Sequence, residues 1–290
     1  MSLYPRAFRR TALALAGLAT AAFASPASAW SDLGHRVVAD LAYERLTPAA
    51  RRQVDTLLRE APVSGEPSCP VTTFADAAVF ADCVDGVRRF NDLRKMHFQA
   101  APLCDMPPAR AEDCKDGECA SAAIKGALAM LADPAQPPSV RLVALEEIAH
   151  FVADLHQPLN MIDNRDDRGE DIRVVLPGSS DKRLNLHLFW NEIVLAPALG
   201  GEEIGVRYLE PIARSGKGWD TGDVDGWAAE TQALARRLYA RLPEPPMCGR
   251  NPRNPETLDR GYVMAAVPVA REQLAKAAIR LATVLNGALR

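Results

Sequence analysis

Val140–His156 reads VRLVALEEIAHFVADLH, and this stretch decides the fold that we expect. Apolar residues occur on almost every side of a helix drawn through it: Val143, Ile148, Phe151, Val152 and Leu155. A helix that is apolar nearly all round is buried among other helices. The stretch therefore predicts a helix in the middle of a bundle.

The chain outside this stretch also shows mostly helical periodicity. Two further amphipathic helices are indicated by apolar stripes, one made of Leu33, Val37, Val38, Leu41 and Ala42, the other of Leu274, Ala278, Leu281 and Leu285. A strand is indicated only at Ile172–Leu176, before Pro177-Gly178, and we expect it to form half of a hairpin. The fold class is therefore mainly α, a multi-helix bundle with a small β-hairpin.

The first 29 residues have the organisation of a secretory signal peptide. They begin with basic residues and no acidic one: Arg6, Arg9 and Arg10. The apolar run Thr11–Phe23 follows, and then Ala27-Ser28-Ala29, which is typical of a cleavage site. We expect cleavage after Ala29, a single domain over residues 30–290 with Trp30 at its N-terminus, and a periplasmic or secreted protein. The run is shorter than the ~20 residues that span a bilayer, so no membrane partner is expected.

The mature chain is acidic. Of the 34 basic residues three lie in the signal peptide, so 31 remain against 37 acidic residues, a net charge of −6. Proteins that bind nucleic acids through charge alone present a positive field to the phosphates. Any phosphate chemistry in this chain would therefore need a local cation, such as a metal ion.

Six cysteines in an exported chain indicate disulfides. Cys114 and Cys119 would close a small loop around the turn Asp116-Gly117. A zinc ribbon is the alternative, but no CxxC motif occurs. Residues 101–117 and 243–255 are rich in proline and polar residues, and we expect them to be loops held by disulfides.

Histidines carry the functional signal. His150 and Asp154 are four residues apart, so on a helix both face one side, which suits chelation of one cation. His187 and Asn191 repeat this spacing with a neutral amide. A single such pair can also be a buried histidine bonded to a carboxylate. However, His35 follows Trp30 by only five residues and His97 follows Phe80-Ala81-Asp82 by fifteen, and four histidines set in motifs indicate one polynuclear metal site.

In these motifs the chain resembles the S1/P1 nuclease family, zinc-dependent single-strand nucleases related to bacterial zinc phospholipase C. The resemblance covers essentially all of residues 30–290. The matching segments are Trp30-Ser31-Asp32-Leu33-Gly34-His35, Ala77-Ala78-Val79-Phe80-Ala81-Asp82, Met96-His97-Phe98, His150-Phe151-Val152-Ala153-Asp154-Leu155-His156-Gln157-Pro158-Leu159 and Asn185-Leu186-His187.

The resemblance implies a zinc cluster within a bundle of the phospholipase C/P1 nuclease type. One zinc ion would be held by Asp82, His97, His150 and Asp154, and a second by Asp154, His35 and the α-amino nitrogen and carbonyl oxygen of Trp30. An α-amino group has a pKa of only ~8, so a metal can deprotonate it. A metal-activated hydroxide would attack the phosphodiester, with Asp82 and Asp154 as the catalytic carboxylates.

Two assignments have alternatives. Phe74-Ala75-Asp76 has the same local pattern as Phe80-Ala81-Asp82, and we favour Asp82 because its spacing to His97 is nearer to the family's usual gap. The other carboxylate would then be a surface or helix-capping group. His156 is six residues from His150 and would point to another face of a continuing helix, so we expect it to be structural or to support a ligand.

The chain departs from the family at the third zinc site. Of its usual ligands only His187 is kept, and Asn160 and Asn191 stand in the other two positions. Amide oxygens are weak zinc ligands, so we expect two tightly bound zinc ions and a third that is weak or absent. A nearby carboxylate could replace them: Asp163, Asp166 or Asp167.

Two more differences lie close to this site. The family's Gly-Gly-Asn reads Arg168-Gly169-Glu170, and Asp85 stands where the family has an arginine, which Arg88 or Arg89 could replace in space. The family pattern also implies a disulfide between Cys104 and Cys248, which leaves Cys69 with Cys83, next to Asp82.

These expectations lead to a secreted, monomeric phosphodiesterase that cleaves single-stranded DNA or RNA, or nucleotides, to 5′-phosphorylated products. The alternatives are a zinc-binding pseudonuclease, or a relative adapted to another phosphoester such as a phospholipid. The intact first two sites favour the enzyme, whereas Asn160 and Asn191 favour the degenerate form.

Overall fold

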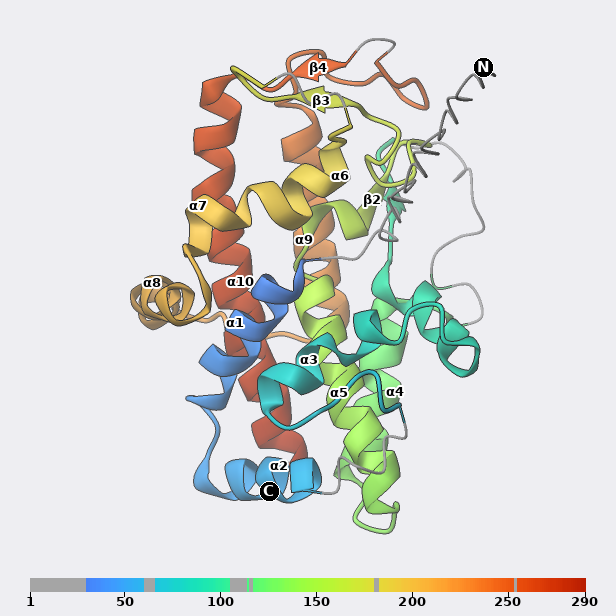
Figure 1. Cartoon of the computed structure of the whole chain (residues 1–290), viewed down its shortest axis with the longest axis vertical. Helices are drawn as coiled ribbons and strands as arrows, with labels where there is room; N and C mark the ends of the chain where they lie inside the picture. The colour runs from blue at the N-terminus through green and yellow to red at the C-terminus, as the bar shows by residue number, and fades with distance from the viewer. Residues whose placement is uncertain (1–29, 60–65, 105–113, 115–116, 180–182, 253–254) are drawn as a thin grey trace, which may run out of the picture.

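The computed structural model describes residues 30–59, 66–104, 114, 117–179, 183–252 and 255–290, and the expected signal peptide lies outside them. The described chain is a bundle of helices with a few short strands (Figure 1), which confirms the predicted mainly α class. The helices are α1 (Asp32–Tyr43), α2 (Pro48–Arg59), α3 (Phe74–Cys83), η2 (Arg88–His97), α4 (Ala120–Ala132), α5 (Pro138–Asp154), η4 (Pro158–Met161), α6 (Leu186–Leu188), η5 (Phe189–Ile193), α7 (Leu195–Leu199), α8 (Glu202–Ser215), α9 (Val224–Tyr239) and α10 (Arg260–Ala288).

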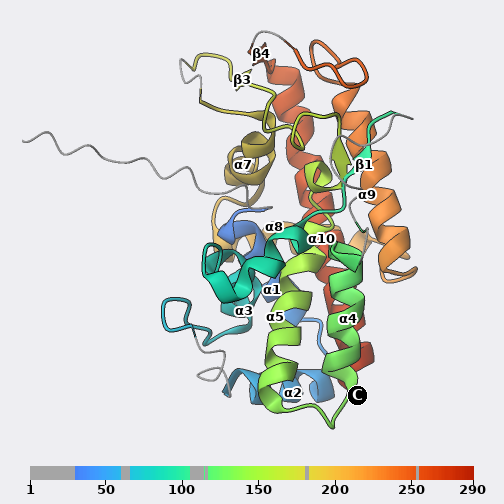
Figure 2. The same cartoon turned by 90° about the vertical axis from the view of Figure 1, so that its right-hand side faces the viewer.

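Helix α5 is the centre of the bundle. It contacts α1, α2, α3, α4 and α10, and it runs alongside α4 in Figure 2. The helix begins at Pro138. A proline is well suited to this position, because the first N–H groups of a helix have no acceptor within the helix. Nearly every residue from Leu142 onward is buried, which confirms the predicted central helix. The helix ends at Asp154 rather than continuing to His156, so the expected continuing helix is wrong for the last two residues.

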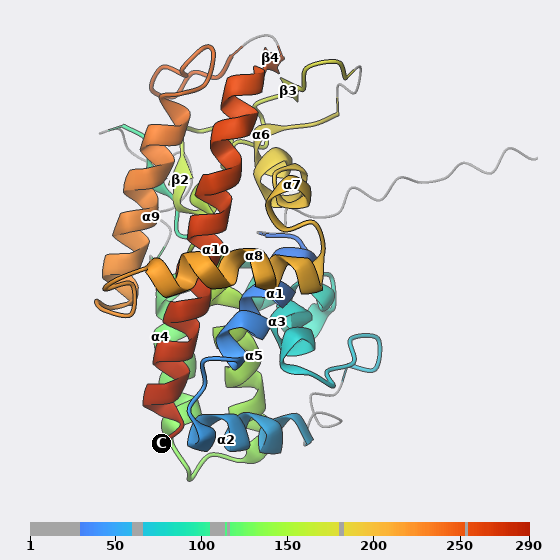
Figure 3. The same ribbon diagram turned by 90° about the vertical axis from the view of Figure 1, so that its left-hand side faces the viewer.

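The two amphipathic stripes form α1 and α10, which pack against each other. Helix α8 lies across α10 and also contacts α1 (Figure 3). None of the described helices is long and apolar enough to cross a bilayer.

The strands are short and pair in parallel. β1 (Ala101–Pro102) pairs with β2 (Ile162–Asp163), and β3 (Val174–Val175) pairs with β4 (Glu256–Thr257). β3 lies within the expected strand, and the hairpin contact is a single antiparallel bridge from Arg173 to Asn185. Backbone hydrogen bonds join Val174 to Leu184 and Leu186 to Ile172 along this side, and β4, distant in the sequence, pairs with the other edge of β3.

Three disulfides fasten the loops to the bundle: Cys69–Cys83, Cys104–Cys248 and Cys114–Cys119. The first fixes the end of α3 immediately after Asp82. The second joins the segment after β1 to the segment before β4, which are far apart in the sequence. These pairs are the ones that the sequence and the family pattern together imply.

Glu146 is an ionisable side chain inside the bundle. It is 1% exposed, and neither carboxylate oxygen makes a hydrogen bond within the described residues. Burial, with a smaller contribution from Glu147, raises its pKa to about 8. The folded state therefore holds this proton more tightly than the unfolded chain does.

Glu146→Leu is expected to stabilise the protein increasingly as the pH rises. The raised pKa contributes stability below the unfolded value of 4.5 that is lost as the pH rises through about 8. The gain should be about 2 kcal/mol or more at pH 8 and smaller at pH 5, measured by denaturant unfolding. The exposed Glu203 provides the control, since Glu203→Leu should give no such pH-dependent gain. Equal gains for the two variants would contradict the prediction.

Candidate metal centre

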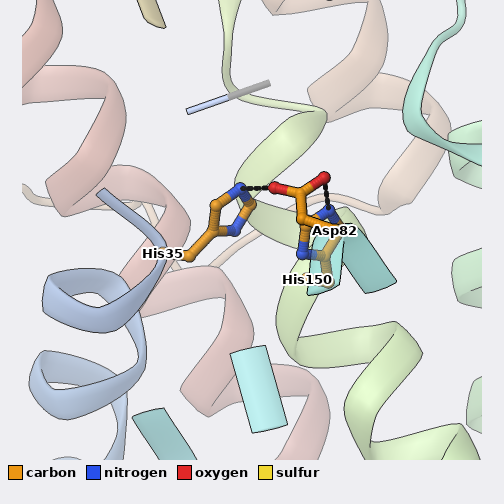
Figure 4. Close-up of side chains that lie close together, drawn as sticks. All are labelled: His35, Asp82 and His150. Atoms are coloured by element: carbon orange, nitrogen blue, oxygen red, sulfur yellow. Dashed lines mark ion pairs between the residues drawn. The ribbon is translucent and has the colours of Figure 1, made fainter. Parts of the chain in front are cut away.

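Four elements bring the predicted ligands together. His35 comes from α1, Asp82 from α3, His97 from the end of η2, and His150 and Asp154 from the last two turns of α5. Figure 4 shows the Asp82 carboxylate between His35 and His150. His150 and Asp154 face the same side because they are one helical turn apart.

Asp154 is the centre of the cluster. It is fully buried, with Oδ1 3.2 Å from His35 Nε2. Its Oδ2 lies 2.9 Å from His97 Nδ1 and 3.1 Å from His150 Nε2. One carboxylate thus faces imidazoles with both of its oxygens, His35 on one side and the other two histidines on the other.

Asp82 forms the open side of the cluster. Its Oδ1 is 3.7 Å from both His97 Nδ1 and His150 Nε2, and its Oδ2 is 4.0 Å from His35 Nε2. The His35 and His150 rings are stacked, 4.1 Å apart. Nδ1 of His97 and Nε2 of His150 are only 3.0 Å apart, so two ring nitrogens converge on one region.

A backbone group that the sequence did not indicate orients His150. Its Nδ1 lies 2.7 Å from the carbonyl oxygen of Ala78 on α3, to which it donates, so Nε2 is turned toward the carboxylates. Burial alone would lower the His150 pKa, but the nearby Asp154 and Asp82 carboxylates outweigh it and raise the pKa to about 9. No side-chain pattern could have identified this contact, because a main-chain carbonyl is its acceptor.

The donor set fits a divalent metal. Ligand atoms of His97, His150 and Asp154 lie within 4.8 Å of one another, as do those of His35, Asp82 and His150. The buried Oδ1 of Asp154 makes no hydrogen bond among the described residues. Imidazole nitrogens with carboxylate oxygens are the usual zinc donors outside thiolate sites. A divalent ion among these side chains would balance the negative charge of the buried Asp154 carboxylate and so offset the free-energy cost of removing that carboxylate from water.

Trp30 is fixed beside this cluster. It is fully buried, and its indole Nε1 donates to the carbonyl oxygen of Ala153, 3.1 Å away, next to Asp154 in the chain. The backbone N–H of Ser31 donates to the carbonyl oxygen of Asn191, 3.0 Å away. Gly34 allows the close approach, because a Cβ at that position would lie 2.7 Å from the Cβ of Trp30.

Asp76 lies outside the cluster and has a structural role. It completes a capping box with Thr73 at the start of α3 and pairs with Arg36 at 2.9 Å. Burial would raise its pKa, but hydrogen bonds from Thr72 and Arg36 outweigh this effect and hold the pKa below its usual range. Of the two candidate aspartates, only Asp82 lies among the histidines.

His156 faces away from the carboxylates. Its Nδ1 donates to the carbonyl oxygen of Val152, and its Nε2 accepts from Arg280 on α10, 2.8 Å away. Burial, together with the charge of Arg280, lowers its pKa to about 3 and keeps the ring neutral. His156 therefore joins the end of α5 to α10.

Two of the three positions of the third metal site are occupied by amides, Asn160 and Asn191. Asn191 lies on the π-helix η5 rather than on one continuous helix with His187, and its Oδ1 accepts from Gln157 Nε2. Asn160 donates from Nδ2 to the carbonyl oxygen of Asp154, 3.3 Å away. Gln157 and Asn191 thus form a neutral hydrogen-bonded pair beside Asn160, and sequence analysis did not indicate the part played by Gln157.

The carboxylates that could replace the missing ligands are engaged elsewhere. Asp166 accepts from the hydroxyl of Tyr239 and from backbone N–H groups of its own loop, and burial raises its pKa to about 7. Asp163 accepts from two backbone N–H groups of the same loop. Asp167 lies 2.8 Å from Arg168. None of the three is directed at the third site by these contacts.

The replacement of the family's arginine by Arg88 or Arg89 stays a prediction. Asp85 pairs with Arg94, whose Nε lies 3.1 Å from its Oδ1. Arg89 instead pairs with Glu66, at 3.3 Å, and stacks on Phe90.

Comparisons with known proteins agree with this geometry. The S1/P1 Nuclease family model matches residues 30–290. Nuclease S1 of Aspergillus oryzae is 26% identical over 286 residues, covering 92% of this chain and 94% of the relative. Endonuclease 2 of Arabidopsis thaliana is 26% identical over 288 residues, covering 89% of each chain. Since the match includes every segment that contributes to the cluster, the chain is a hydrolase of ester bonds in nucleic acids and belongs to the S1/P1 nuclease family.

Proposed function

We propose that this protein is a secreted zinc-dependent nuclease that cleaves single-stranded DNA or RNA to 5′-phosphorylated products. The observation that carries the proposal is Asp154, a buried carboxylate with His35 near one oxygen and His97 and His150 near the other. A single carboxylate in this setting can bridge two metal ions. The names of the matched relatives, Nuclease S1 and Endonuclease 2, support endonucleolytic cleavage.

The chain's own residues would hold two ions. Asp82, His97, His150 and Asp154 are the donors for the first ion, and Trp30, His35 and Asp154 are those for the second. When bound, zinc supplies Lewis-acid charge and lowers the pKa of water to near neutrality. The protein supplies the positions, since Ala78 fixes the His150 ring and the Trp30 indole fixes the chain start beside Asp154.

The third ion would bind weakly, because only His187 offers a strong donor and Asn191 already accepts from Gln157. Family membership and the convergence of His35, Asp82, His97, His150 and Asp154 favour the enzyme over a pseudonuclease. We expect a monomer in the periplasm or outside the cell, after loss of residues 1–29.

The test uses the purified mature chain, residues 30–290. We expect two tightly bound zinc ions by elemental analysis, and faster cleavage of single-stranded than of duplex DNA of the same sequence. End-group analysis of the products should find 5′-phosphates. Chelation should abolish cleavage, and added zinc should restore it.

The double variant Asn160→His with Asn191→Asp is the comparison for metal content. It should raise the zinc count towards three and the rate on single-stranded DNA by at least ~10-fold, about 1.4 kcal/mol of barrier. Three tightly bound ions in the unaltered protein would contradict the weak third site. Cleavage that is unaffected by chelation would contradict zinc dependence.

A further inference from the structure

A strained loop lies between η4 and α6, beside the third site. Three of its non-glycine residues adopt left-handed backbone conformations: Arg165 (φ 62°), Asp167 (φ 52°) and Arg168 (φ 60°). Residues other than glycine rarely adopt this region, and such strain is retained where the surrounding structure or a function requires it. A glycine would adopt the backbone conformation of Arg168 without strain, so the arginine at this position is explained by its side chain and not by its backbone.

The Arg168 side chain is held in one direction. Its guanidinium lies over the ring of Phe98, with the guanidinium carbon 3.9 Å from the ring centroid. The side chain is only 11% exposed, and its buried Nε makes no hydrogen bond among the described residues. Nη2 lies 2.8 Å from Asp167. A stacked guanidinium keeps its N–H edge in a fixed plane, which suits an anion with two oxygens.

Arg168 contacts one expected metal ligand, His187, and the chain neighbour of another, His97. Phe98 follows the expected ligand His97, and their rings contact each other with centroids 6.0 Å apart. The carbonyl oxygen of Arg168 accepts from Nδ1 of His187 at 2.9 Å. Arg168 thus stands next to His187, where the other two positions of the third site hold only Asn160 and Asn191.

We propose that Arg168 binds a phosphate oxygen of the nucleic-acid substrate beside His187. Because Asn160 and Asn191 make the third site a weak metal site, the guanidinium would supply the positive charge that a metal ion would otherwise provide there. The inference rests on the proposed function. Arginine binds phosphate through two parallel N–H donors, and its charge does not depend on pH in the working range. Nη2 also faces two carboxylates, Asp167 at 2.8 Å and Glu170 at 3.9 Å, so the phosphate would compete with them for the guanidinium.

The experiment measures phosphate binding directly. The zinc-loaded mature protein is titrated with inorganic phosphate by calorimetry, and KM and kcat are measured on a single-stranded oligonucleotide. Arg168→Ala and Arg168→Gly should each weaken phosphate binding by at least ~10-fold and raise KM. Arg168→Lys should keep part of the affinity, because it retains the charge without the planar donors. The slope of log(1/KM) against log salt should fall by about 0.7 for one lost phosphate contact.

Arg165→Ala is the matched control, since Arg165 has the same charge and backbone conformation in the same loop but is exposed. It should bind phosphate as the unaltered protein does. Arg168→Gly also relieves the strain, so its melting temperature should be unchanged or higher. A purely structural Arg168 predicts a lower melting temperature with unchanged phosphate affinity.

Equal losses for Arg165→Ala and Arg168→Ala would overturn the proposal, as would unaltered protein that binds no phosphate. If the protein cleaves no nucleic acid but Arg168→Ala alone loses phosphate, the phosphate site stands and the proposed function fails. If the protein cleaves single strands and Arg168→Ala binds phosphate normally, the proposed function stands and this inference fails.

Discussion

Asp154→Asn is expected to lower the rate of single-stranded DNA hydrolysis by at least ~1,000-fold, about 4 kcal/mol of barrier. Asp154 is fully buried and faces three imidazoles, so an amide in its place removes the negative charge that both expected ions share. Neutral amide oxygens bind zinc weakly. The zinc content should therefore fall together with the rate, as measured by elemental analysis and steady-state kinetics.

Asp76→Asn is the matched control for this substitution. Asp76 is also a carboxylate near α1 and α3, but it caps α3 and pairs with Arg36 instead of meeting the histidines. It should cost about 1 kcal/mol of stability while leaving zinc content and rate close to those of the unaltered protein. If Asp154→Asn retained two zinc ions and the full rate, Asp154 would not be the bridging carboxylate.

A protein that keeps a single residue before Trp30 is expected to bind one zinc ion fewer and to lose at least ~100-fold in rate. The extension places the α-nitrogen of Trp30 in a peptide bond, which is not a zinc donor as an amine is. The indole bond to Ala153 and the contact with Gly34 fix this end of the chain, so it cannot move to offer another donor. Elemental analysis and kinetics measure both effects.

The control is the same extended protein after the added residue has been removed by a specific protease. Cleavage should restore the second ion and the rate together, because the sequence from Trp30 onward is unchanged. An extended form with full zinc content and full rate would show that the Trp30 α-nitrogen is not a ligand. The result would leave the Asp154 prediction unaffected.

Local patterns in the sequence were sufficient for the main helices and for part of the candidate site. The period of one apolar face predicted α1 and α10, and the nearly all-round apolar character of Val140–His156 predicted α5. The spacing of His150 and Asp154 predicted their common face. The strand partner of β3 was not predictable, because β4 is about 80 residues away and only three-dimensional packing selects it.

The sequence by itself determined the residue types of the cluster, their helical register, and the presence of the weakly ligating amides Asn160 and Asn191 at two positions of the third site. Only the tertiary structure decided which aspartate joins the histidines, because Asp76 and Asp82 have equal local patterns and differ in what their side chains meet. It also turned His156 toward Arg280 and placed Arg168 over Phe98. These outcomes depend on contacts between segments far apart in the chain, and the energies of such contacts do not appear in the spacing of any one segment.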